Sequence, residues 1–73
     1  MNMQPVTSSQ INSVGYDPAT QTLAVQFKGK TPTTYTYSGV PAQVYDGLLK
    51  AESVGKFFAY AVKGKFQYKK VGG

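Results

Sequence analysis

The pattern of apolar and polar positions along the chain is most regular between residues 54 and 62. Apolar side chains recur there at i, i+3, i+4, i+7 and i+8, the spacing of one face of an α-helix. They are Val54, Phe57, Phe58, Ala61 and Val62. Ser53 precedes the pattern at an N-cap position, and Gly64 follows it as a residue that tolerates a left-handed cap. We therefore predict a helix at residues 54–62 whose apolar face enters the core.

A second helix is predicted from Pro41, because proline suits the first position of a helix. The apolar stripe of this helix consists of Val44, Tyr45, Leu48 and Leu49. Gly47 lies inside the stripe and weakens the helix. Residues 50–53 form the joint to the next helix, so we expect a bent helical pair over residues 41–63.

Alternation of apolar and polar residues predicts strands on both sides of this pair. Residues 23–27 alternate strictly, residues 34–38 alternate threonine with tyrosine, and the turn at residues 28–32 predicts a hairpin between them. Residues 8–16 break the alternation once, so a strand there requires a bulge or a bend. Residues 65–69 alternate again and predict a terminal edge strand with a basic outer face.

The predicted order of elements is β-β-β-α-α-β. Three antiparallel strands and a returning fourth present one apolar face, which the helices cover. The expected fold is therefore α+β, a small two-layer domain in which an antiparallel sheet of about four strands packs on a bent pair of helices. Residues 8–70 form this single domain, residues 1–7 are expected to be a flexible N-terminal arm, and residues 71–73 a frayed tail.

Composition narrows the possible classes of function. The 73 residues include no cysteine and no histidine, which excludes disulfides, thiolate chemistry and nearly every structural zinc site. A reducing, cytoplasmic compartment is expected. The first residues lack the features of a signal peptide, and the longest apolar run, residues 57–62, is too short to span a bilayer.

The formal net charge of +5 is unevenly distributed, because five lysines and no acidic residue follow Glu52. Together with two tyrosines, these lysines are the candidate partner-binding residues: Lys56, Tyr60, Lys63, Lys65, Tyr68, Lys69 and Lys70. Such a field favours an anionic partner, either nucleic acid or an acidic protein surface, although solubility alone also accounts for it. Lysine without arginine gives diffuse attraction, so sequence-specific reading of bases is disfavoured.

Catalysis is not expected from this set of residues. The three carboxylates have structural roles: Asp17 in a turn, Asp46 on a helix surface and Glu52 at the helix joint. None of the serines has a partner that activates it. No metal-ligand cluster or phosphate-binding loop is present in the sequence. We therefore expect a protein that is not an enzyme, with no cofactor, metal site or small-molecule substrate.

Most of the predicted turn and core residues fall into short stretches whose order is informative. The stretches are Ser8-Ser9 with Ile11, Gly15-Tyr16-Asp17, residues 23–27, Tyr35-Thr36-Tyr37, Val40-Pro41, Tyr45, Leu48-Leu49, residues 51–58, and Lys63 with Phe66 and Tyr68. In this order they resemble the KTSC domain, a small module found at the C-terminus of some lysyl-tRNA synthetases and as a stand-alone bacterial or phage protein. The resemblance covers residues 8–70. The loop at residues 28–33 departs from it, being longer than the short glycine turn usual before the third strand.

The resemblance leaves two functions open. The chain is similar to stand-alone phage members of the family that bind bacterial RNA polymerase subunits. This implies a non-enzymatic regulator in the host cytoplasm that inhibits initiation and acts as an antiterminator. The synthetase context instead implies an RNA-binding module, in which the lysines act with tyrosines as stacking platforms. The candidate platforms are Tyr35, Tyr37, Tyr60 and Tyr68.

Overall fold

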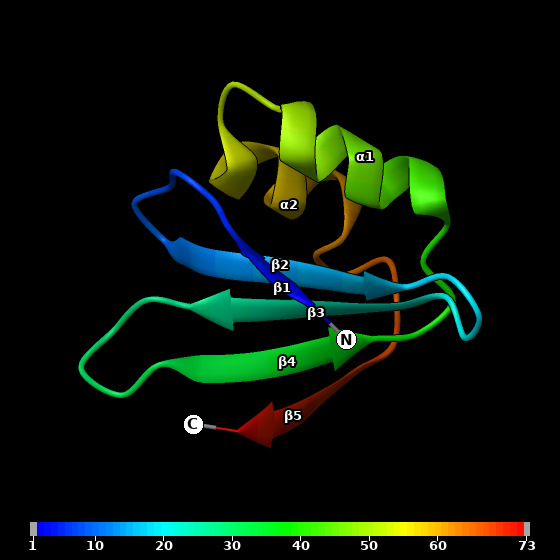
Figure 1. Ribbon diagram of the computed structural model, residues 1–73, viewed down its shortest axis with the longest axis horizontal. Helices are drawn as coiled ribbons and strands as arrows, with labels where there is room; N and C mark the ends of the chain where they lie inside the picture. The colour runs from blue at the N-terminus through cyan, green and yellow to red at the C-terminus, as the bar shows by residue number, and fades with distance from the viewer. Residues whose placement is uncertain (1, 73) are drawn as a thin grey trace.

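The structure, a computed structural model, describes residues 2–72, which contain five strands and two helices. In chain order they are β1 (Met3–Pro5), β2 (Ile11–Asp17), β3 (Thr22–Phe27), β4 (Thr33–Tyr37), α1 (Ala42–Lys50), α2 (Val54–Ala61) and β5 (Tyr68–Gly72). The strands form one antiparallel sheet in the order β1-β2-β3-β4-β5. Both helices lie on one face of this sheet (Figure 1). The predicted two-layer α+β fold is confirmed.

The sheet has one strand more than the sequence predicted, because part of the expected N-terminal arm is paired. β1 runs antiparallel to β2, with Met3 opposite Gly15 and Pro5 opposite Ser13. The Val6 N–H donates to the Asn12 carbonyl at 3.2 Å and continues this pairing. The expectation of a flexible arm at residues 1–7 is therefore corrected for residues 3–5, where backbone hydrogen bonds order the chain; Met1 lies outside the described residues.

β5 returns to the sheet after the helices and pairs with β4 as the expected terminal edge strand, but it begins at Tyr68. The strand predicted at residues 65–69 is therefore corrected for residues 65–67, which form the connection from α2. Tyr68 lies opposite Tyr37, and Lys70 lies opposite Tyr35. The strand continues to Gly72, which pairs with Thr34. The expected frayed tail at residues 71–73 is thus corrected for residues 71 and 72, and Gly73 lies outside the described residues.

The break in alternation in β2 is a β-bulge, as predicted. The register shifts between Ile11 and Ser13, so Asn12 is the extra residue. Because of this extra residue, Ile11 and Val14 are both fully buried although they are three positions apart. Asn12 instead donates from Nδ2 to Gln26 Oε1 at 2.9 Å on the exposed side of the sheet.

The local signals that mark turns and helix ends are confirmed. Ser53 Oγ accepts a hydrogen bond from the Lys56 N–H at 3.3 Å and caps α2. Gly64 adopts a φ of 76°, which is the left-handed conformation expected after that helix. In the turn after β2, Asp17 Oδ1 accepts from the Ala19 N–H at 3.0 Å.

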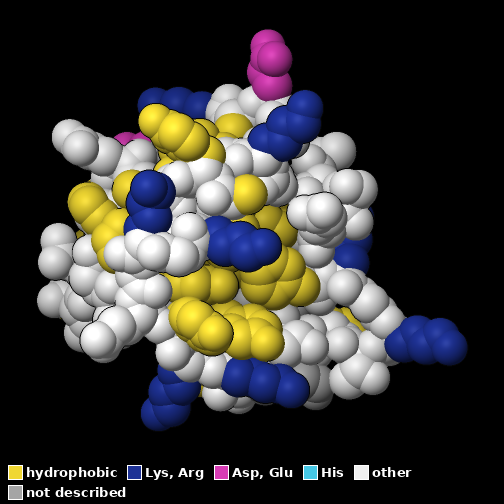
Figure 2. Space-filling view, turned by 180° about the vertical axis from the view of Figure 1, so that it is seen from behind, with side chains coloured by type: hydrophobic (Ala, Val, Ile, Leu, Met, Phe, Trp, Pro, Cys, Tyr) yellow, Lys and Arg dark blue, Asp and Glu magenta, His cyan; other side chains and the backbone are white. Residues whose placement is uncertain are grey.

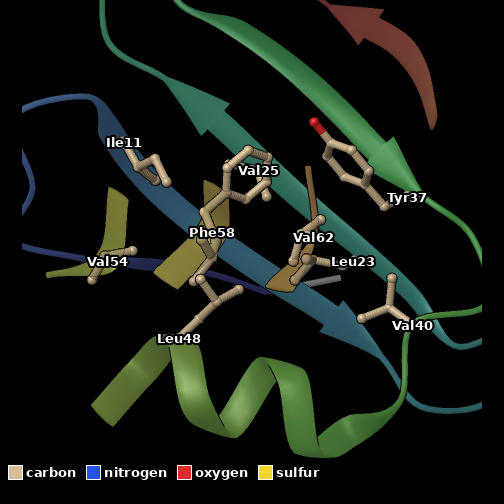
Figure 3. Close-up of a cluster of buried hydrophobic side chains, with 10 residues drawn as sticks. Ile11, Leu23, Val25, Tyr37, Val40, Leu48, Val54, Phe58 and Val62 are labelled. Carbon is tan, nitrogen blue, oxygen red and sulfur yellow. The ribbon is translucent and has the colours of Figure 1, made fainter. Parts of the chain in front are cut away.

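The core lies between the sheet and the helices. Its fully buried side chains come from β2, β3, the loop before α1, α1 itself and the C-terminal cap of α2: Ile11, Val14, Leu23, Val25, Val40, Leu48 and Val62. In Figure 3, Phe58 and Val62 from α2 and Leu48 from α1 extend toward the strands. The predicted apolar face of residues 54–62 therefore enters the core.

Gly47 allows the two helices to approach closely. A Cβ atom built on Gly47 would lie 2.3 Å from Cζ of Phe57, well inside van der Waals contact. The glycine that the sequence marks as weakening α1 thus has a packing role, because the Phe57 ring occupies the space above it.

Candidate functional site

A groove opens between α2 and the half of the sheet formed by β3, β4 and β5. Its volume is about 540 Å³. Aromatic side chains supply much of its lining: Phe27, Tyr35, Tyr37, Phe58 and Tyr68. Lys63 and Gly64, just after α2, line its other side. The groove exists because the short helices leave this half of the sheet incompletely covered.

The aromatic rings of the groove contact one another in a chain. Phe58 packs edge-to-face against Phe27 and Tyr37, with centroid distances of 5.4 and 5.5 Å. Tyr68 lies 5.7 Å from Tyr35 and 5.8 Å from Tyr37 between ring centroids. These contacts hold the rings in fixed orientations and make the aromatic side of the groove a preorganised surface.

The rings differ sharply in exposure. Tyr37 is 6% exposed, whereas Tyr68, at the edge of the sheet, is 66% exposed. Burial raises the pKa of the Tyr37 hydroxyl above its ordinary value of 10.0, and the neighbouring Tyr35 and Tyr68 add to this effect. The buried ring of Tyr37 therefore forms a wall of the groove, while the exposed ring of Tyr68 is available to a ligand.

A second hollow, also of about 540 Å³, continues the groove toward the N-terminus of α2. The two hollows share Gln10, Gly55 and Ala59. Lys56 and Glu52 line the second hollow, so its charge is mixed. We refer to these two neighbouring hollows together as the channel along α2. The Gln10 side chain lies against Gly55 where they meet, and Lys56 and Lys63 line different hollows.

Two serine hydroxyls beside this channel accept hydrogen bonds from backbone N–H groups. Ser8 Oγ accepts hydrogen bonds from the N–H groups of Gln10 and Ile11, each at 3.2 Å, and Ser53 Oγ caps α2. Both hydroxyls thus stabilise backbone turns. Among residues 2–72, no group of three or more histidine, cysteine or acidic side chains is placed to hold a metal ion.

The structure brings only part of the predicted partner-binding set to the channel. Lys56, Lys63 and Tyr68 line it. Lys70 lies opposite Tyr35, and because cross-strand partners share a face of the sheet, it borders the groove. Lys65 is exposed in the segment between α2 and β5.

The remaining two predicted residues point elsewhere. Lys69 lies opposite Thr36, between two groove-facing residues of β5, so its side chain projects from the opposite face of the sheet. Tyr60 is 78% exposed and lines neither hollow, although on α2 it is the i+4 neighbour of Lys56 and the i−3 neighbour of Lys63. Lys69 is therefore separated from the groove by the alternation of β5, and Tyr60 lies outside the groove lining.

Six groove residues were neither predicted binding residues nor candidate stacking platforms: Gln10, Phe27, Gly55, Phe58, Ala59 and Gly64. The periodic pattern assigned both phenylalanines to the core, which is where most of their surface lies. Figure 2 shows the molecule from behind the view of Figure 1: hydrophobic side chains gather at the middle of this face, and lysines lie across and around them. Acidic side chains appear only toward its upper edge.

A family model described as the KTSC domain matches residues 7–66. The chain belongs to the KTSC domain family. The same fold occurs in the crystal structure of a KTSC domain protein from Yersinia pestis, with a TM-score of 0.90, 44% identity and 97% of each chain covered. The resemblance of the sequence to this family is thereby confirmed.

Relatives of this KTSC domain occur both as small proteins and within a larger enzyme. A protein from Tsukamurella paurometabola is 52% identical over 89% of this chain and 94% of its own length. One from Stutzerimonas stutzeri is 38% identical over 86% of both chains. A lysine–tRNA ligase from Nostoc is 36% identical over 86% of this chain, which corresponds to 11% of the ligase.

Neither helix of the described residues is long and apolar enough to cross a membrane.

Proposed function

We propose that this KTSC domain is a non-catalytic RNA-binding module whose ligand lies in the channel along α2. The observation that carries the proposal is the position of Lys63 in one groove with the exposed ring of Tyr68. Lysines attract phosphates, and aromatic rings stack on bases of any sequence. The relatives among lysine–tRNA ligases, which are named for an RNA substrate, support an RNA ligand.

The chemistry of the channel favours binding without sequence specificity. The chain carries eight lysines and no arginine, so it lacks the planar fork that recognises guanine with two hydrogen bonds. Lysine ammonium groups instead act as point charges on the phosphate backbone. Affinity is therefore expected to depend on ionic strength more than on the order of bases.

The test is the affinity of the full chain for a fluorescently labelled RNA, measured by anisotropy over a range of salt concentrations. Each phosphate neutralised on a single strand contributes a slope of about −0.7 to the logarithm of affinity against the logarithm of salt. Three channel lysines therefore predict a slope of roughly −2. Absence of binding at low salt would contradict the proposal.

A second candidate function is that of a transcription regulator that binds bacterial RNA polymerase, inhibiting initiation and acting as an antiterminator. The observation that favours a protein partner is the position of β5. Within the described residues this strand has a neighbour on one side only, so every second residue presents unpaired backbone groups beside an apolar groove. An extended segment of a polymerase subunit could pair there.

The two candidates are separated by a pull-down from bacterial lysate on the immobilised protein, with and without nuclease. Core RNA polymerase that remains after nuclease treatment supports the regulator. Ribosomal proteins and RNA that are lost after nuclease treatment support the RNA-binding module. The double variant Lys56→Glu and Lys63→Glu should abolish either interaction while the circular dichroism spectrum stays unchanged, because both side chains are exposed.

A further inference from the structure

We infer that the channel binds unpaired RNA, with one base stacked on the ring of Tyr68. This inference rests on the proposed RNA-binding function and adds the state of the RNA and the residue that receives the base. Tyr68 combines two properties that a stacking platform requires. Its side chain is 66% exposed, and its ring is held against Tyr35 and Tyr37 at tilts of 58° and 39°.

The other rings of the groove are less suited to this role. Tyr37 and Phe58 are each 6% exposed, and they pack edge-to-face against each other with an angle of 74° between their planes. Both rings are therefore nearly inaccessible to a base, whereas Tyr68 is the exposed ring of the groove.

Positive charge lies beside this platform on both sides of the groove. Lys63 lines the helix side, and Lys70, two residues after Tyr68, lies opposite Tyr35 on the same face of the sheet. A strand whose base stacks on Tyr68 thus passes between two cations that can contact its phosphates. The outer face of β5 offers Lys69 beside Thr36, with no aromatic platform.

The shape of the site favours a single strand over a duplex. Bases in A-form RNA are stacked inside the helix, and side chains cannot read its deep, narrow major groove. Stacking on Tyr68 therefore requires a base that is already unpaired. On the α2 side the groove is lined by the small residues Gly55 and Ala59, and the Gln10 side chain lies against Gly55.

Tyr60 provides a matched comparison for Tyr68. It is 78% exposed, so it is at least as accessible, but it does not line the groove. Replacing either tyrosine by leucine removes one exposed ring and leaves the net charge unchanged. The two variants therefore differ only in the location of the lost ring.

The experiment measures binding of a labelled oligouridylate and of an RNA duplex of equal length by anisotropy. We expect the oligouridylate to bind more tightly than the duplex. Tyr68→Leu should weaken its binding roughly 5-fold or more, Tyr68→Phe should restore it, and Tyr60→Leu should leave it unchanged. Equal binding of the duplex, or equal effects of Tyr68→Leu and Tyr60→Leu, would overturn this inference while RNA binding itself stands. Failure of both RNAs to bind would overturn the proposed function as well.

A spectroscopic measurement covers the case in which Tyr68→Leu does not fold. The chain contains no tryptophan, so Tyr68→Trp and Tyr60→Trp each introduce a single tryptophan, which can be excited selectively over the tyrosines. Stacking of a base on residue 68 should quench the fluorescence of Tyr68→Trp as oligouridylate is added, with no change in Tyr60→Trp. The same response at both positions would contradict stacking in the groove.

Discussion

The contact between Gly47 and Phe57 gives a prediction in which one substitution has opposite effects in two backgrounds. Gly47 lies inside α1, where alanine is more favourable than glycine by about 1 kcal/mol. In the native packing, however, an added Cβ would lie 2.3 Å from Cζ and 3.0 Å from both Cε atoms of Phe57. The ring would have to move away and lose part of its packing.

The expected free energies follow from these two effects. Overpacking of this kind costs about 1–3 kcal/mol, so Gly47→Ala should lower the free energy of unfolding by up to about 2 kcal/mol after the gain in helix propensity. Once Phe57→Ala has removed the ring, the same substitution should raise stability by about 1 kcal/mol. The coupling between the two positions is therefore about 1–3 kcal/mol.

The assay is urea unfolding of the native chain, both single variants and the double variant, followed by circular dichroism. A chain of 73 residues is expected to have a free energy of unfolding of roughly 4–11 kcal/mol. Phe57→Ala removes a half-buried ring and should cost about 2 kcal/mol, which leaves the variant folded. An effect of Gly47→Ala that is the same in both backgrounds would refute the close approach of the helices.

Three further predictions concern single side chains. Ser53→Ala removes the N-cap of α2 and should lower the free energy of unfolding by about 1 kcal/mol in urea unfolding, whereas Ser9→Ala, at an exposed turn, should have no effect. Tyr16→Phe removes the hydroxyl that donates to the Val40 carbonyl and should cost about 1 kcal/mol by the same measurement. The pKa of the Tyr37 hydroxyl is raised in the folded state, so as pH rises the unfolded chain loses this proton before the folded chain does. The free energy of unfolding should therefore fall as pH rises above 10.0, and it should fall less in Tyr37→Phe.

The elements that the sequence predicts correctly are those whose signals are local. The period of residues 54–62, the Ser53 cap and the Gly64 conformation all involve neighbours within about one helical turn. The hairpin formed by β3 and β4 also depends on adjacent residues. Such features need no knowledge of distant contacts, and the structure confirms each of them.

β1 could not be predicted in the same way. Its three residues, Met3, Gln4 and Pro5, show no alternation, and all are exposed. They form a strand because β2 presents a free edge beside them, and that edge is a property of the sheet. The pairing of β1 with β2 therefore cannot be predicted without knowing that β2 has a free edge in the folded sheet.

The groove could not be predicted from the sequence pattern for a related reason. Phe27 and Phe58 follow the periods of core residues, and they do pack in the core, but helices of nine and eight residues cannot cover all five strands. Which part of the sheet remains uncovered depends on the position of the two helices on it. By contrast, the separation of Lys69 from Tyr68 and Lys70 follows directly from the alternation of side chains along a strand.

The central claim is that RNA binds in the channel along α2, and a pair of charge-matched variants tests it most directly. Lys63→Ala and Lys69→Ala each remove one exposed lysine, but only Lys63 lines the groove. In anisotropy titrations with a labelled single-stranded RNA, Lys63→Ala should weaken binding and reduce the magnitude of the salt slope by about 0.7, with little change for Lys69→Ala. Equal losses for the two variants would mean that RNA responds only to the net charge of the protein, and would contradict a binding site in the groove.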